Sequence, residues 1–513
     1  MSQKPIQLFK SRVALIAGAG PTGLTLACEL ARRGIDLRLI EPLERRTMQS
    51  RALGIQPRTL ETFQKMGIIE PFLKHGLPVR QLNVYRNGKK LLEVNLREID
   101  SPFPYILSIP QAETERILTE HLESFGKKIK RGVKLSSIRN GCATLSQKTG
   151  EEELIAPTWI IGCDGAHSSV RHSLNVPFKG TKFSEVFILA DLTVEGPYAH
   201  DEAHLFFSDE GLFGFVPLPQ PNQFRLIAPF PEDSKITAET LDLDFFEKMA
   251  RQRIGFGDLH IKNPTWISLF HVHRRIVSQM RFENIFLAGD AAHIHSPAGG
   301  QGLNMSVQDA YNLAWKLAFV ESGRAPDSLL NSYQKERHPV AKRVLFSTTL
   351  VTEIITSPVK WTKDVASFVM RLLLKTPARM ILLRGMAGIS IRYKGNSIRS
   401  QSFWDRFWCA PKVGVRAPDA ELADRTKLFD ALRQKDFLLL TFAPLPAHIK
   451  EKLESLGIAT LLAEGETVRK VYSAKEGSLF LIRPDGYISY RSRTLNQQHL
   501  LDYLSAFCYT SAP

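Results

Sequence analysis

The residues best suited to chemistry form a glycine-rich turn near the N-terminus, Gly18-Ala19-Gly20-Pro21-Thr22-Gly23. An apolar run enters this turn, and helical spacing leaves it from Leu24 to Arg33. Gly18 permits a tight turn, Gly20 lets backbone N–H groups approach a pyrophosphate, and Gly23 lets the helix pack on its strand. Strand, turn and helix together predict a dinucleotide site with phosphate at the helix N-terminus.

A carboxylate and a distant second segment extend this site. The apolar run from Ile35 to Ile40 ends at Glu41, where a carboxylate can accept hydrogen bonds from a ribose. Much later, a strand-like run from Asn284 ends in Gly289 and Asp290. Two separated segments that converge on one dinucleotide point to FAD. The alternative is a tight strand-to-helix turn that binds no ligand.

Two further stretches carry small residues, which let the backbone pass close to a ligand. The first, Gly162 to Arg171, follows the apolar run Trp159 to Ile161. The second, Ala291 to Asn304, contains a proline and three glycines. It leads into a predicted helix over Gly302 to Val320, whose apolar residues lie on one stripe.

Taken in order, these motifs resemble the FAD-dependent aromatic hydroxylases, the group that contains phenol, hydroxyphenylpropionate and aromatic polyketide hydroxylases. The motifs that carry the resemblance are the glycine turn, Ser50-Arg51-Ala52-Leu53-Gly54, Gln111, Asp164-Gly165 and Gly289-Asp290. They are spread over residues 12 to about 345. Their occurrence in one order is far more specific than any single motif.

The resemblance implies a role for each motif residue. Asp290 is expected to bond the ribityl or neighbouring hydroxyls, and Arg51 and Gln111 to flank the pyrophosphate and flavin. Asp164 with Arg171 is expected to support the cofactor side shared with NAD(P)H. Taken alone, such arginines are more often surface salt-bridge residues. The predicted cofactor-binding residues are Gly18, Gly20, Pro21, Thr22, Gly23, Glu41, Arg51, Gln111, Asp164, Arg171, Gly289, Asp290, Pro297, Gly300, Gly302, Leu303 and Asn304.

The same resemblance implies the reaction. NADH or NADPH reduces the flavin, O2 adds to give a C4a-hydroperoxide, and one oxygen is transferred to an aromatic ring. The cofactor carries this chemistry, so the chain must orient the ring and exclude water. The N-terminus of the helix at Gly302 is expected to stabilise the negative charge of the reduced flavin.

The substrate wall is expected in the strand-rich region from about 180 to 275, where Phe206, Phe213 and Phe215 could line a pocket. Alternating aromatic residues in strands are also typical of a core. His271 and His273 could carry protons or be structural, so no catalytic base is assigned. A nearby pair, His293 and His295, lacks a third ligand at a recognisable spacing, so no metal is predicted.

Composition narrows the class of protein. The chain has 513 residues, 43% of them apolar, and a formal net charge of +15. Its lysines and arginines are dispersed and no recognition motif occurs, so we expect no nucleic acid partner; the positive field could instead attract anionic pyridine nucleotide. The five cysteines show neither metal nor disulfide spacing, which favours a reducing, cytoplasmic location.

No signal peptide or transmembrane run is expected. The most apolar stretch, Phe368 to Ile391, is interrupted by four arginine or lysine residues. It could lie on a membrane surface or pack against the protein's own body, and we favour the second interpretation.

The fold class predicted is α/β: a Rossmann-like FAD-binding domain, an interleaved β-rich substrate domain and a C-terminal thioredoxin-like domain. The predicted boundaries are 1–180 and 278–400 for the FAD-binding domain with its helical segment, 181–277 for the substrate domain, and 401–513 for the last domain. Cys409 and Cys508 lack the Cys-x-x-Cys spacing of a redox dithiol, so this domain is expected to be structural or to form a subunit contact, as in a homodimer.

The predicted function is an FAD monooxygenase that uses NAD(P)H and O2 to hydroxylate a phenolic or polycyclic aromatic substrate. Two alternatives stay open. A polyprenyl-quinone-precursor hydroxylase shares the motifs at Asp164 and Asp290, although the extra C-terminal domain argues against it. A flavin-binding sensor that has lost turnover would keep the same cofactor residues.

Overall fold

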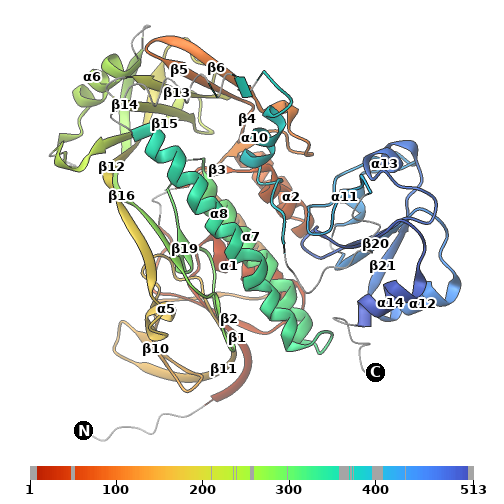
Figure 1. The fold of residues 1–513 in the computed structure, drawn as a ribbon. Helices are drawn as coiled ribbons and strands as arrows, with labels where there is room; N and C mark the ends of the chain where they lie inside the picture. The colour runs from red at the N-terminus through yellow and green to blue at the C-terminus, as the bar shows by residue number, and fades with distance from the viewer. Residues whose placement is uncertain are drawn as a thin grey trace, which may run out of the picture.

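The computed structural model describes residues 9–47, 52–208, 211–234, 236–237, 240–254, 259–296, 299–356, 369, 372–373, 375–394, 408–433 and 435–505. Within them the chain is a mixed α/β protein with two large sheets and two smaller ones. The sheets and the helices between them are arranged as Figure 1 shows. None of the helices in these ranges is both long and apolar enough to cross a bilayer.

The first large sheet collects strands from distant parts of the chain and runs in the order β17-β18-β11-β1-β2-β8, with β9 and β10 attached to β11. Its strands are β1 (Phe9–Ala17), β2 (Leu37–Glu41), β8 (Ile129–Arg131), β9 (Val133–Arg139), β10 (Cys142–Gln147), β11 (Glu152–Gly162), β17 (Arg281–Phe282) and β18 (Ile285–Leu287). β1 is parallel to β2 and β11, with Ala17 beside Ile40 and Gly162. Since β11 is also parallel to β18, the carboxyl ends of four strands meet at one edge.

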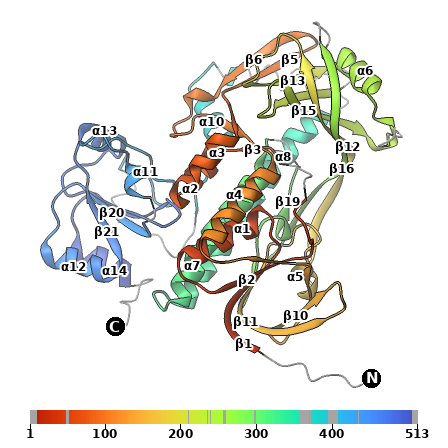
Figure 2. The same ribbon diagram turned by 180° about the vertical axis from the view of Figure 1, so that it is seen from behind.

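Helices from three parts of the chain pack together on this sheet: α1 (Pro21–Arg32), α4 (Gln111–Ser124) and α7 (Gln301–Glu321). Figure 2 shows α4 lying along α1, and α1 contacts α7. Every residue of α7 from Asn304 to Phe319 is buried, because its predicted apolar stripe packs on the sheet while Trp315 and Phe319 face another core. The predicted helix over 302–320 is therefore confirmed.

The second large sheet has the order β19-β16-β12-β15-β14-β13-β5-β6. Its strands are β5 (Gln81–Arg86), β6 (Lys89–Asn95), β12 (Phe178–Glu195), β13 (Glu202–Ser208), β14 (Gly211–Pro217), β15 (Gln223–Pro231), β16 (His260–Val277) and β19 (His293–Ile294). It is antiparallel apart from the pair β13 and β5, as the alternating pattern predicted. The sheet also recruits β5 and β6, which lie outside the predicted range 181–277.

One helix packs on a face of this second sheet, and the end of another approaches the opposite face. α6 (Leu243–Ile254) packs on one face through Phe246 and Met249. The long helix α8 (Asn331–Thr356) approaches the other face, where Arg274 on β16 forms an ion pair with Glu353 at 3.0 Å. Figure 1 shows α6 at the outer side of the sheet and the upper end of α8 beneath it.

A short three-stranded sheet, β3-β7-β4, joins the two large ones. It consists of β3 (Gly54–Ile55), β4 (Leu77–Val79) and β7 (Ile106–Ser108). The helices α2 (Pro57–Met66) and α3 (Ile69–His75) lie between β3 and β4 in the sequence. The Ser108 hydroxyl donates a hydrogen bond to the carbonyl of Pro217 at the end of β14. This contact ties β7 of the small sheet to β14 of the second large sheet.

The basic apolar segment predicted over 368–391 is described in part. Its helix α10 (Arg379–Met386) buries Leu383 against Leu96 and Ile99, and Arg379 pairs with Glu98 at 3.0 Å. Helix α10 therefore packs on the protein itself through Leu383, whereas the apolar side chains of Val369, Leu372, Leu373 and Ile381 are exposed. Residues 368, 370–371 and 374 lie outside the described ranges.

Residues 408–505, which we call the C-terminal unit, form a four-stranded sheet in the order β21-β20-β22-β23. Its elements are α11 (Leu428–Ala431), β20 (Phe437–Thr441), α12 (Ala447–Ser455), β21 (Ile458–Leu462), α13 (Glu466–Val471), β22 (Leu479–Ile482), β23 (Ile488–Ser492) and α14 (Gln497–Ser505). β20 is parallel to β21 and antiparallel to β22. Trp315 and Phe319 of α7 pack into the core of this unit with Phe437.

Candidate functional site

The glycine turn lies where the first sheet ends, between β1 and α1. Gly18 has φ +97°, and a Cβ there would lie 2.4 Å from the carbonyl oxygen of Cys163 at the end of β11. A Cβ at Gly23 would lie 1.9 Å from the Gly18 carbonyl oxygen. Gly20, the residue that caps α1, has open space instead. The turn therefore needs two glycines for close backbone packing and leaves the helix N-terminus accessible.

Glu41, at the end of β2, supports the same turn. Its Oε2 accepts a hydrogen bond from Ala19 N at 2.8 Å, and its Oε1 accepts one from Leu43 N at 3.1 Å. The side chain is thus held beside the glycine turn, where the ribose was expected. Both carboxylate oxygens retain lone pairs for a further donor.

The second predicted segment meets the first. Gly289 has φ +60°, and a Cβ there would lie 2.6 Å from the Thr22 hydroxyl and 2.9 Å from the Ser306 hydroxyl. The loop that begins at Gly289 is thus packed between Thr22 in the first turn of α1 and Ser306 in the second turn of α7. Its next residue, Asp290, is exposed to solvent. Two segments separated by more than 260 positions in the sequence form one site.

Asp164 and Arg171 connect this site to the end of β11. The Oδ2 atom of Asp164 accepts hydrogen bonds from Ser169 N at 2.6 Å and Val170 N at 3.2 Å, at the start of α5 (Ser169–Ser173). Its Oδ1 atom is buried and has no hydrogen-bond partner. Arg171 donates to the carbonyl of Ala291 at 3.0 Å, which fixes the Asp290 loop, and burial lowers the pKa of this arginine.

Gln111 and Asn304 hold the segment between residues 52 and 56. The backbone N–H of Gln111 donates a hydrogen bond to the Ala52 carbonyl at 3.2 Å, and its side-chain Oε1 accepts one from Ala52 N at 3.4 Å. Asn304 accepts a hydrogen bond from Gln56 N at 2.9 Å and donates to the Gly54 and Gly300 carbonyls at 2.9 and 2.8 Å. Arg51 and Pro297, both predicted site residues, lie outside the described ranges.

The N-terminal part of α7 lies against the loop that contains Asp290. Its capping residue Gly300 adopts a left-handed conformation, with φ +61° and ψ 32°, that glycine reaches without strain. Gly302 and Leu303 lie in the first turn, and Leu303 packs partly against the core of the first sheet. The unpaired N–H groups of this turn favour a negative ligand group.

Sequence reasoning missed the buried carboxylate of Asp309 on α7. Its Oδ2 accepts hydrogen bonds from Gly289 N at 3.2 Å and His293 Nε2 at 2.7 Å, and its Oδ1 accepts one from Arg337 Nε at 2.6 Å. Burial alone would raise the pKa of Asp309, but Arg337 and His293 lower it to about 2. The one signal that could have found it is an acid beside the apolar stripe of the predicted helix, at Asp309 between Val307 and Tyr311.

The paired histidines have separate partners. His293 is bound to Asp309, whereas His295 Nδ1 lies 3.0 Å from the carbonyl of Ser296. Burial lowers the pKa of His295 to about 4, so its imidazole is neutral at physiological pH. In the part of the chain that the structure describes, no three His, Cys, Asp or Glu side chains are grouped as metal ligands. His271, by contrast, is bound to Glu232 at 3.1 Å.

Phe206, Phe213 and Phe215 lie side by side on β13 and β14, with ring centroids 4.7 to 6.5 Å apart. All three are buried in one core with Phe246 and Met249 of α6. They therefore face α6, and this placement favours the interpretation that they are core residues.

Because strand side chains alternate, the other face of these strands carries different residues. It presents Arg225 on β15, which forms a bidentate ion pair with Asp191 on β12, both contacts at 2.7 Å. The Arg225 guanidinium lies 4.5 Å from the centre of the Trp266 ring. Neighbouring positions on the same face are apolar and half-buried, such as Leu205 and Val216.

These features together describe a site for a dinucleotide. An open helix N-terminus, an exposed carboxylate at Asp290 and an unpartnered buried oxygen at Asp164 surround the carboxyl edge of a parallel sheet. Ligands of such folds bind outside this edge. The residues present fit FAD.

Comparison with known proteins agrees with this geometry. Residues 10–348 match the family model described as FAD binding domain, and residues 410–508 match the one described as aromatic-ring hydroxylase, C-terminal. The chain is 32% identical to 6-methylpretetramide 4-monooxygenase of Streptomyces rimosus, over 93% of this chain and 90% of that protein. It is 34% identical to a flavin-dependent monooxygenase of Mycobacteroides abscessus, over 96% and 99%.

Two more similarities bear on the chemistry. Pentachlorophenol 4-monooxygenase of Sphingobium chlorophenolicum is 31% identical, over 93% of each chain. Among solved structures, the OxyS anhydrotetracycline hydroxylase of Streptomyces rimosus superimposes with a TM-score of 0.79 at 27% identity, covering 99% of this chain and 100% of that one. The protein described here therefore belongs to the family of FAD-dependent aromatic-ring monooxygenases.

Proposed function

We propose that this monooxygenase takes electrons from NADH or NADPH and uses O2 to hydroxylate a phenolic or polycyclic aromatic ring. The observation that carries the proposal is the packing of the Gly289 loop against the first turn of α1, with the α7 N-terminus beside both. When bound there, FAD would accept electrons from the nicotinamide and activate O2. The similar proteins named above, which act on tetracycline-type and chlorophenol compounds, support the substrate class.

Each predicted cofactor residue has a proposed task. The N-terminus of α1 at Gly20 would receive the pyrophosphate, and Glu41 the ribose hydroxyls. Asp290, exposed at the meeting of both segments, would bond the ribityl chain. The free oxygen of Asp164 would accept a hydrogen bond from the cofactor, because a buried carboxylate oxygen without a donor is costly. Arg51, Gln111 and Pro297 remain proposed neighbours of the flavin.

The α7 N-terminus has a distinct proposed task. Its first-turn N–H groups, made accessible by Gly300 and Gly302, would stabilise negative charge on the reduced flavin ring. Leu303 and Asn304 would fix that turn, since Asn304 is bound on three sides by backbone groups. No second glycine fingerprint occurs in the sequence, which favours transient docking of the nicotinamide nucleotide, drawn in by the positive field.

The substrate wall that we propose is the face of the second sheet opposite α6. That face carries the ion pair between Arg225 and Asp191, with Val216 opposite Arg225 on β14 and Leu205 one strand further, on β13. Apolar area would hold a flat ring, and the 17% exposed side chain of Asp191 offers an acceptor for a phenolic hydroxyl. This assignment replaces Phe206, Phe213 and Phe215, whose rings face α6, as our preferred pocket residues.

The domain description is also a proposal. The parallel sheet around β1 supports a Rossmann-like FAD-binding domain over 1–180 and 278–400, with the substrate domain over 181–277 between its parts. In the C-terminal unit, within 401–513, the order of elements β20-α12-β21-α13-β22-β23-α14 with strands arranged 2-1-3-4 supports a thioredoxin-like domain. We propose a cytoplasmic enzyme without a nucleic acid partner.

The test is a panel of phenols, from monocyclic to tetracyclic, assayed for accelerated NAD(P)H oxidation and for hydroxylated products. We expect at least one substrate to speed flavin reduction in stopped-flow absorbance and to yield product. Asp191→Asn should weaken binding of that substrate, whereas Asp201→Asn should not, because Asp201 is a half-buried residue that pairs with Arg80 at 3.9 Å. If no phenol changes the reduction rate or gives product, the sensor interpretation is favoured; selective turnover of a prenylated phenol would favour the quinone-precursor hydroxylase.

A further inference from the structure

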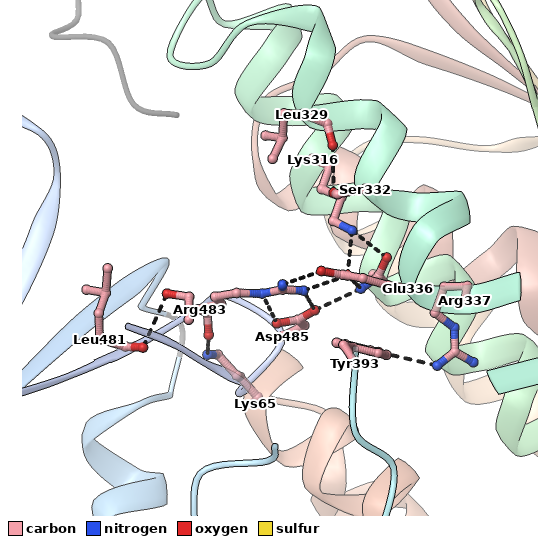
Figure 3. Close-up of polar contacts among 12 residues, drawn as sticks. Lys65, Lys316, Leu329, Ser332, Glu336, Arg337, Tyr393, Leu481, Arg483 and Asp485 are labelled. Carbon is pink, nitrogen blue, oxygen red and sulfur yellow. Dashed lines mark hydrogen bonds and ion pairs between the residues drawn. The ribbon is translucent and has the colours of Figure 1, made fainter. Parts of the chain in front are cut away.

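A cluster of buried charges lies outside the cofactor site, where α7 and α8 meet the C-terminal unit (Figure 3). Glu336 on α8 accepts hydrogen bonds from both terminal nitrogens of Arg483, at 2.5 and 2.9 Å, and from Lys316 Nζ at 2.7 Å. Asp485 accepts hydrogen bonds from Arg483 Nε at 2.9 Å and Asn312 Nδ2 at 3.0 Å. We call these five residues the interface network. It fixes the turn after β22 against two helices of the flavin-binding part.

The next residue on α8, Arg337, makes contacts in another direction. Its Nε donates to Asp309 Oδ1 at 2.6 Å, and its Nη2 donates to the carbonyl of Met305 in α7 at 3.2 Å. Its Nη1 donates to the hydroxyl of Tyr393 at 3.3 Å. This guanidinium is fully buried, so each contact matters for its orientation.

Tyr393 is held by the C-terminal unit. Its ring is stacked on Tyr487, with centroids 4.2 Å apart and an interplanar angle of 27°. Its backbone N–H donates to the Gly414 carbonyl at 2.8 Å, and Gly414 N donates to the Ile488 carbonyl at 2.8 Å. The position of the Tyr393 hydroxyl is therefore set by residues of the C-terminal unit.

Joined together, these contacts form an unbroken path. Tyr487 stacks on Tyr393, Tyr393 bonds Arg337, and Arg337 bonds Asp309. Asp309 in turn accepts hydrogen bonds from Gly289 N and His293 Nε2, and these two residues lie at the two ends of the loop that contains Asp290. We call these residues, from Tyr487 to Gly289, the tyrosine–arginine relay.

A second set of contacts starts from the same turn of the C-terminal unit. Arg58 on α2 donates to the Asp485 carbonyl and to Glu61 Oε2, the latter at 3.0 Å. α2 begins directly after Gln56, whose N–H is bound to Asn304 in the first turn of α7. The C-terminal unit thus supports the cofactor site from two sides.

We propose that Tyr487 is a positioning residue for the flavin site: through Tyr393 and Arg337 it holds Asp309 against the loop that begins at Gly289. The inference rests on the cofactor site proposed above. Its physical basis is that a buried guanidinium has discrete bonded arrangements, so removing one partner reorients it and weakens the others. The coupling between Tyr487 and Asp309 is measured by the variants that follow.

The test compares three variants of the full chain by FAD titration of the apoprotein and by visible circular dichroism of the bound flavin. Tyr487→Leu should raise the FAD dissociation constant about tenfold and change the flavin dichroism. Tyr393→Phe keeps the stack but loses the bond to Arg337, so an increase of about threefold is expected. Tyr487→Phe keeps the ring stack, so its FAD dissociation constant and flavin dichroism should equal those of the wild type.

The matched control is Tyr472→Leu. Tyr472 is equally buried in the C-terminal unit, but its hydroxyl bonds the Pro418 carbonyl and its ring packs on Phe480, away from the relay. This variant should lose stability while FAD affinity stays within about twofold of wild type.

The single variant Asp309→Asn and the double variant Tyr487→Leu with Asp309→Asn complete a thermodynamic cycle with Tyr487→Leu. If the relay carries the effect, the two losses of FAD affinity are not additive. Additive losses, an unchanged dissociation constant in folded Tyr487→Leu, or equal losses in Tyr472→Leu would each overturn the proposal. None of these readouts needs substrate or nicotinamide, so failure here and failure of the phenol assay are distinguishable.

Discussion

Glu336→Gln tests how strongly the C-terminal unit is bound to the rest of the chain. The substitution keeps the size of the side chain and removes its charge. Arg483 would still pair with Asp485, and Lys316 would keep Asn312 Oδ1 at 2.8 Å, but the shared anion of the interface network would be gone. The variant leaves two buried cations with one carboxylate between them.

Two arguments give the size of the expected loss in the free energy of unfolding. Removing one partner of a buried ion pair costs roughly 3–5 kcal/mol. Burial alone would raise the pKa of Glu336, but Arg483 and Lys316 lower it from 4.5 to about 2. A shift of this size corresponds to about 3 kcal/mol, at 1.36 kcal/mol per unit of pKa. We therefore expect the free energy of unfolding to fall by about 3 kcal/mol at pH 7.

The sign of the pH dependence is also set. A carboxyl group with a lowered pKa in the folded state stabilises fully above its ordinary pKa and loses this contribution as the pH falls toward 2. The difference in the free energy of unfolding between wild type and Glu336→Gln should therefore be about 1 kcal/mol smaller at pH 4 than at pH 7.

The assay is urea unfolding of the FAD-saturated protein followed by far-UV circular dichroism. Glu247→Gln is the control, because Glu247 pairs at 2.9 Å with Arg251, whose side chain is 77% exposed. That surface pair should contribute less than about 0.5 kcal/mol. This account of the interface network would be refuted if Glu336→Gln lowered the free energy of unfolding by less than about 1 kcal/mol. A difference from wild type that did not change with pH would also refute it.

Two further predictions concern single side chains. Asp290→Ala should lower FAD affinity by roughly 1.5–3 kcal/mol, the loss of one charge-assisted hydrogen bond, in titrations compared with exposed Asp327→Ala; unchanged affinity would remove Asp290 from the site. Burial lowers the pKa of Lys65 to about 7, so the unfolded chain binds more protons than the folded one between pH 7 and 10.5, and stability should rise with pH in that window. Lys65→Met should therefore stabilise the protein at pH 7 by roughly 1–3 kcal/mol and flatten that rise, whereas destabilisation in urea would contradict the argument.

Local patterns predicted the parts of the fold in which close neighbours in the sequence set the structure. The glycine turn could be assigned because Gly18 and Gly23 meet atoms that leave no room for a Cβ. The helix over 302–320 followed from its period, since nearly all of its apolar stripe is buried. In both cases the signal lies within one turn or one helix.

Long-range choices could not be read in the same way. Period-two alternation places Phe213 and Phe215 on one face of β14, but it does not say which face meets α6 or that Phe206 joins that face from β13. Asp309 and Arg337 are 28 positions apart, and Glu336 and Arg483 are 147 apart. Their pairing depends on how distant elements pack against one another, and a local pattern in the sequence does not specify that packing.

The two buried networks together constrain α8. Adjacent helical residues project about 100° apart, so Glu336 and Arg337 face different partners, the C-terminal unit and the flavin loop. A rotation of α8 that improved one set of bonds would break the other. Pro339 lies just beyond this pair inside the helix, where it removes a backbone hydrogen bond to the carbonyl four residues earlier. Because buried ion pairs hold the turn that contains this carbonyl from both sides, α8 can keep its helical path at the position where its own backbone is weakest.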